Sequence, residues 1–74
     1  MSYNYSKLKG RIIEKFGSQQ KFAEAIGLSE RTLSLKMTNK VFWKQAEISE
    51  ATRLLELEEA QISDYFFTQN VQCD

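Results

Sequence analysis

Two short helical patterns meet at residues 26–29 (IGLS), and this junction constrains the fold more than any other part of the sequence. Gly27 stands where a tight turn needs a positive φ, a conformation that glycine adopts without steric cost. Ala23 is small where the two helices would approach each other, and Leu28 and Leu33 would seal the second helix against the first. The junction therefore predicts two helices locked at a steep angle, the second raised above the surface.

The rest of the chain also has the pattern of short helices, and it contains no proline, repeat or low-complexity tract. Serine caps at Ser6, Ser18 and Ser29, glycine stops and helical apolar spacing predict five helices. We expect them at residues 6–16, 18–26, 29–38, 44–55 and 58–67, followed by a short tail at 68–74. The residues expected to face inward are Leu8, Ile12, Ile13, Phe16, Phe22, Ala23, Ile26, Leu33, Met37, Ile48, Ala51, Leu54, Leu55, Ile62, Tyr65 and Phe66. The sequence thus predicts a single compact all-α domain over residues 1–74.

Composition excludes most catalytic chemistry. The 74 residues include no histidine and one cysteine, Cys73. Histidine-dependent triads and zinc sites are therefore excluded, as are an internal disulfide and a cysteine-rich metal site. We expect no catalytic residues, no metal and no cofactor. No apolar run approaches the ~20 residues that cross a bilayer, and residues 1–9 hold no secretory signal, so we expect a cytoplasmic protein that does not enter a membrane.

The net charge of zero conceals two parts of opposite sign. Residues 1–44 carry nine bases and three acids, whereas residues 45–74 carry one base and seven acids. An asymmetry of this size suggests a polyanion as the partner of the first part. Two solvated faces of a helical bundle would give the same pattern, so charge alone leaves both interpretations open.

The segment Ser18–Asn39 resembles the helix-turn-helix of the lambda-repressor-like family, which includes the Cro and CI regulators of temperate phages. The similarity extends over most of the chain, from Ser6 to Phe67. The residues that fill the opening, small, glycine and hydrophobic positions of the motif are Gln19, Ala23, Gly27 and Leu33. One departure is Lys36, which stands where the family usually has a hydrophobic residue.

The resemblance implies a recognition helix that starts just after Ser29 and enters the major groove of DNA. The side chains that would face the bases are Glu30, Arg31, Ser34 and Leu35. Arg31 would fork onto a guanine, or lie solvated at the surface. Glu30 would accept from a cytosine, or serve as a first-turn acid that favours the helix dipole. Leu35 would touch a thymine methyl, or pack partly buried against Phe42.

Phosphate contacts would surround this helix and supply affinity rather than sequence choice. The residues expected to make them are Gln19, Gln20, Lys36, Asn39, Lys40 and Lys44. The acidic second part would face away from the DNA. Its aromatic residues would close the core or form a homodimer seam, since family members commonly bind near-palindromic sites as dimers. The candidate seam residues are Tyr65, Phe66, Phe67 and Val71.

The primary functional prediction is a Cro-like or CI-like repressor that binds double-stranded operator DNA as a homodimer and occludes a promoter. The alternative is an antirepressor or modulator that uses the same scaffold to bind a partner repressor protein. The neutral total charge, the acid at Glu30 and the apolar Leu35 on the supposed reading face motivate this alternative.

Overall fold

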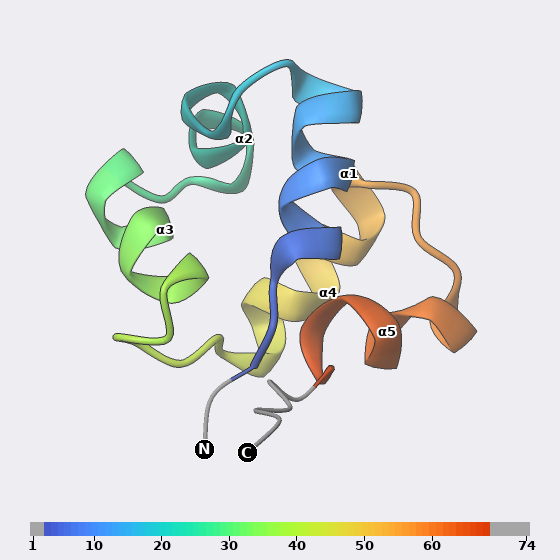
Figure 1. Cartoon of the computed structure of the whole chain (residues 1–74). Helices are drawn as coiled ribbons and strands as arrows, with labels where there is room; N and C mark the ends of the chain where they lie inside the picture. The colour runs from blue at the N-terminus through green and yellow to red at the C-terminus, as the bar shows by residue number, and fades with distance from the viewer. Residues whose placement is uncertain (1–2, 69–74) are drawn as a thin grey trace.

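Five α-helices and one 3₁₀ turn follow one another in residues 3–68, the part of the chain that this computed structural model describes (Figure 1). They are α1 (Ser6–Phe16), α2 (Gln19–Ile26), α3 (Glu30–Met37), α4 (Gln45–Leu54), the 3₁₀ turn η1 (Glu59–Gln61) and α5 (Ile62–Phe66). The predicted fold class, a five-helix all-α domain, is confirmed. α1 and α4 run through the middle of the molecule, and α2 and α3 lie along one side (Figure 1).

The first three helices begin where a side chain accepts a backbone N–H. Ser18 Oγ accepts from Lys21 N at 3.2 Å, and Ser29 Oγ accepts from Thr32 N at 3.0 Å. The expected cap at Ser6 is wrong. Ser6 is the first residue of α1, and its N–H donates to Asn4 Oδ1 at 2.9 Å. An Asx turn one step earlier thus prepares the first helix.

The segment expected as one helix at 58–67 is divided in two. The Gln61 N–H donates to the Glu58 carbonyl at 2.8 Å, an i→i+3 bond that tightens the chain into η1. The Gln61 side chain in turn accepts the Glu58 N–H at 2.9 Å. These two bonds complete a 3₁₀ turn, and the α-helix starts only at Ile62 and ends at Phe66.

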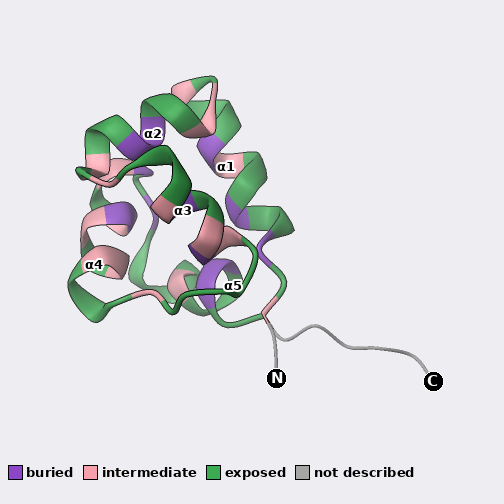
Figure 2. Ribbon diagram, turned by 90° about the vertical axis from the view of Figure 1, so that its left-hand side faces the viewer, coloured by how far each residue is buried: buried purple, intermediate pink, exposed green. Residues whose placement is uncertain are grey.

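The core is formed by the inward faces of all five helices (Figure 2). Its largest fully buried side chains are Phe22, Phe66, Leu8, Ile12, Leu33 and Leu55. Ile13, which we expected to face inward, is exposed. Neighbouring residues on a helix point about 100° apart, so Ile13 turns to solvent when Leu8 and Ile12 occupy the core.

The first and last described residues are tied together. The Asn4 N–H donates to the Thr68 carbonyl at 2.7 Å, and the Tyr3 ring packs edge-on against Phe67 with centroids 5.9 Å apart. Both ends of the described chain therefore emerge on the same side of the bundle (Figure 1).

Candidate functional site

The segments on either side of α3 in the chain hold this helix so that one of its faces projects outward. Gly27 adopts the left-handed conformation at φ 81°, and its N–H donates to the Glu24 carbonyl. Leu33 is fully buried beneath the helix. On the opposite face, the four residues predicted to read bases line a shallow hollow of about 510 Å³: Glu30, Arg31, Ser34 and Leu35. The structure therefore brings these four together, three of them exposed and Leu35 half-buried.

Lys36 lies inside the protein, whereas the sequence led us to expect it at the surface, in contact with a DNA phosphate. Only 2% of its surface is exposed. Its ammonium lies 2.7 Å from Glu47 Oε1 and donates to the Phe42 carbonyl at 2.9 Å. The expected phosphate contact is therefore wrong, because the charge is already held by these two internal partners. Lys36 occupies the inward position that a hydrophobic residue fills in the lambda-repressor-like pattern.

Glu47 is the partner that makes this burial possible. Its carboxylate binds Lys36 and also accepts the N–H of Lys44, at 2.8 Å, at the start of α4. Partial burial raises the pKa of the Glu47 carboxyl. The two hydrogen bonds and the positive charges of Lys36 and Lys44 outweigh that effect, so the pKa lies below its usual value. Glu47 is thus held ionised at neutral pH.

The turn between α3 and α4 displays an aromatic ring to solvent. Phe42 is 81% exposed and Val41 beside it is also exposed. The next residue, Trp43, turns inward and packs edge-on against Phe66 with ring centroids 5.2 Å apart. Leu35 adjoins the turn through its carbonyl, which accepts the N–H groups of Lys40 and Val41. Leu35, Val41 and Phe42 form a surface that we call the α3–turn patch.

The sequence did not lead us to expect Phe42 in a protein interface. We expected Phe42 to cover Leu35, or to belong with Trp43 to a turn that holds the DNA backbone. The available signal was three successive apolar residues, at 41–43, directly after the break in the helical pattern. Exposed apolar residues that adjoin one another are typical of interaction surfaces.

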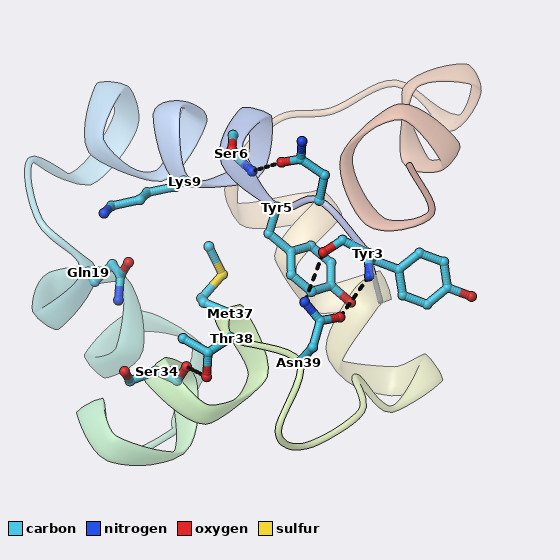
Figure 3. Close-up of a pocket in the computed structure, with 10 residues that line it drawn as sticks. Tyr3, Tyr5, Ser6, Lys9, Gln19, Ser34, Met37, Thr38 and Asn39 are labelled. Carbon is cyan, nitrogen blue, oxygen red and sulfur yellow. Dashed lines mark hydrogen bonds between the residues drawn. The ribbon is translucent and has the colours of Figure 1, made fainter. Parts of the chain in front are cut away.

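A second hollow, of about 550 Å³, lies between the start of α1, the start of α2 and the end of α3 (Figure 3). Gln19 lines this hollow opposite Lys9. Asn39 closes one end, where its side chain accepts the Tyr3 N–H and donates to the Tyr3 carbonyl, each at 2.8 Å. The amide predicted to hold a DNA phosphate is therefore engaged with the chain's own backbone.

The remaining expected phosphate contacts are divided between two parts of the chain. Gln20 is exposed on α2, whereas Lys40 and Lys44 are exposed in the connection that follows α3. Of the expected dimer seam, Tyr65 and Phe66 are buried in the core and offer no seam. Phe67 is half-exposed beside Tyr3, and Val71 lies outside the described residues.

Ion pairs join the two oppositely charged parts of the chain. Bases of the first part pair with acids of the second part in three contacts: Lys7 with Asp64, Lys15 with Glu56, and Lys36 with Glu47. The two oppositely charged parts therefore bind each other. This arrangement weakens the inference of a polyanion partner, because several of the bases counted toward it have internal partners.

Within residues 3–68 no group of three or more potential ligands could hold a metal ion, and no helix is long and apolar enough to span a membrane.

Comparison with known proteins identifies relatives of the chain. The solved solution structure of the modulator of repression (MOR) of the temperate bacteriophage TP901-1 from Lactococcus lactis is similar to it. The two share 54% sequence identity over 97% of each chain, with a TM-score of 0.80. A family model described as "Protein of unknown function (DUF739)" matches residues 1–69. None of the curated proteins matches the chain.

These findings correct two predictions. The assignment to the lambda-repressor-like Cro and CI regulators is wrong, since the matching family model is a different one. The function of an operator-binding repressor is also overturned, because the solved relative is a modulator of repression. The DNA contacts expected of α2 and α3 belonged to that function and lose their basis with it. The chain belongs to the DUF739 family.

Proposed function

We propose that this chain is a modulator of repression, a phage-related regulatory protein that binds a repressor protein. The observation that carries the proposal is the 54% identity, over 97% of both chains, with the modulator of repression of phage TP901-1. Such an encounter takes place in the cytoplasm, where repressors meet their operators. The proposal assigns the chain no catalytic step and no operator sequence of its own.

The α3–turn patch is the surface that we assign to repressor binding. Phe42 supplies a large, exposed apolar ring, and aromatic anchors of this kind dominate the energetics of many protein interfaces. Glu30 and Arg31 stand at the edge of the hollow beside Leu35, where opposite charges would orient a partner. An apolar centre with a charged rim is the usual anatomy of a protein interface.

The test is to measure binding to the repressor of phage TP901-1, the phage of the solved relative, by isothermal titration calorimetry. Phe42→Ala should weaken the complex about 30-fold, since truncating an interface anchor costs about 2 kcal/mol or more. Phe67→Ala is the matched control, because it removes an exposed phenyl ring far from α3 along the chain. The control should bind within about twofold of the unaltered chain.

Two results would contradict the proposal. The first is a folded, unaltered chain that does not bind the repressor at micromolar concentration. The second is equal weakening by Phe42→Ala and Phe67→Ala, which would remove the α3–turn patch from the interface. Amide shifts of the ¹⁵N-labelled chain on repressor addition would then identify the surface that binds.

A further inference from the structure

The buried ammonium of Lys36 is bound to the turn that carries Phe42 and to Glu47 in α4. Its ammonium donates to the Phe42 carbonyl at 2.9 Å and lies 2.7 Å from the Glu47 carboxylate. The same carboxylate oxygen accepts the Lys44 N–H at 2.8 Å. One lysine and one glutamate therefore fix the backbone before and after Trp43.

This arrangement is not the one that gives the most stability. A buried ion pair contributes little net stability, because desolvation of the two charges offsets their attraction, and apolar residues of similar size often serve as well. A simple apolar contact would also leave the Phe42 carbonyl without its ammonium donor. The Lys36–Glu47 pair instead fixes the position of the Phe42 carbonyl and of the Lys44 N–H.

The fixed backbone on both sides of Trp43 decides which of the two rings, Phe42 or Trp43, points inward and which points outward. Trp43 is directed inward onto Phe66, and the Lys36 ammonium lies 6.0 Å from the centre of the Trp43 ring. Phe42, adjacent in the chain, is then directed outward and lies 81% exposed. A turn free to rotate would exchange or average these two orientations.

We infer that Lys36 is a positioning residue for repressor binding, which orders the turn so that Phe42 is held ready for the partner. The inference rests on the proposed function and adds to it the buried device that prepares the docking surface. Without this device the turn would have to become ordered during binding, and the affinity would fall by the cost of that ordering.

The test uses the double variant Lys36→Met/Glu47→Gln in the full chain. It removes both charges together, so that neither remains unpaired, and the new amide oxygen still accepts the Lys44 N–H. Lys40→Met is the matched control, because it makes the same change at an exposed lysine of the same connection. Circular dichroism melting establishes that each variant is folded.

Two readouts separate positioning from general stability. The heteronuclear ¹H–¹⁵N NOE of residues 41–43 should fall in the double variant while that of α3 is kept. The affinity for the repressor should fall about tenfold, the cost of ordering about one or two side chains and the turn. In the Phe42→Ala background the same double change should have no further effect on affinity, since Lys36 acts through Phe42.

A turn as rigid in the double variant as in the unaltered chain overturns the inference, as does unchanged repressor affinity in a folded variant. Additive losses in the Phe42→Ala background also overturn it. If the double variant does not fold, the NOE of residues 41–43 in the unaltered chain still decides, because a turn less ordered there than α3 would show that the Lys36–Glu47 pair does not order it. Absence of repressor binding by the unaltered chain overturns the proposed function instead, and the NOE still decides whether Lys36 orders the turn.

Discussion

The two connections that hold α3 are built on different principles. The connection before it, at residues 27–29, uses contacts between near neighbours: a glycine at positive φ and the Ser29 hydroxyl on the N–H of Thr32. The connection after it, at residues 38–44, depends on partners outside it. Asn39 is bound to Tyr3, and the Lys36–Glu47 pair holds the Phe42 carbonyl and the Lys44 N–H. One connection sets the angle of the helix, and the other displays the aromatic ring beside it.

This difference teaches that a familiar motif can keep its first half and change its second. The local signals at residues 26–29 are those of a helix-turn-helix, and the structure builds them as expected. The change begins at Lys36, where an inward charge replaces an apolar contact. The resemblance to DNA-binding regulators rested on these local signals, which do not by themselves specify what the second helix binds.

Among the substitutions that test this difference between the two connections, the largest effect is expected at Lys36. Lys36→Ala leaves the Glu47 carboxylate, whose side chain is 17% exposed, without its buried partner and opens a cavity beneath α3. Removing one member of a buried pair costs about 3 kcal/mol or more. Urea unfolding monitored by circular dichroism measures the loss. A loss no larger than that caused by Lys40→Ala would show that the distant partners do not hold this connection.

The next effect compares two glycines under the same substitution. Gly27→Ala should lower the free energy of unfolding by about 1 kcal/mol, because alanine is strained at the φ of 81° found there. Gly10→Ala, inside α1, should raise it by about 0.5–1 kcal/mol, since alanine is the better helix former. An added Cβ meets open space at both positions, so thermal melts of the two variants isolate the backbone term. Equal signs would contradict this account of the first connection.

The same difference between local and long-range contacts explains how much of the structure the sequence alone predicted. Serine caps, glycine stops and helical spacing placed the helices to within a residue or two, apart from the segment divided at η1. The departure from the family pattern at Lys36 marked an inward position, but the ion pair was beyond that reasoning, because Glu47 is eleven positions away and no pattern joins the two residues. The exposure of Phe42 was beyond it too, since Phe42 and Trp43 are alike in sequence and opposite in placement.

A smaller difference is expected between two substitutions of Asn39, which combines a positive φ of 66° with two hydrogen bonds to Tyr3. Asn39→Gly keeps the backbone conformation and removes the bonds, whereas Asn39→Ala removes the bonds and adds strain. We expect losses of about 0.5–1 kcal/mol for glycine and about 1 kcal/mol more for alanine, measured by urea unfolding. Identical losses would show that the contact with Tyr3, and not the conformation, governs this end of α3.

The smallest effect is a pH dependence. The pKa of Glu47 is lowered on folding, so its contribution to stability is present above the ordinary value near 4.5 and is lost as pH falls through the lower, folded value. The free energy of unfolding should therefore decline toward acid, and Glu47→Gln should flatten part of that decline. Glu30→Gln, at an exposed position on α3, provides the comparison. Equal slopes for the two variants would show that the buried pair is not linked to protonation.

The bond from Asn4 to Thr68 has a consequence for how the chain can be rewired. Because residues 4 and 68 are neighbours, a brief linker between them would close the polypeptide into a ring without disturbing any helix. That ring could then be opened beside Glu58 and Glu59, which are exposed, and circular permutants are generally tolerated at such surface sites. The order of helices along the polypeptide would change while the face that bears Phe42 stayed whole.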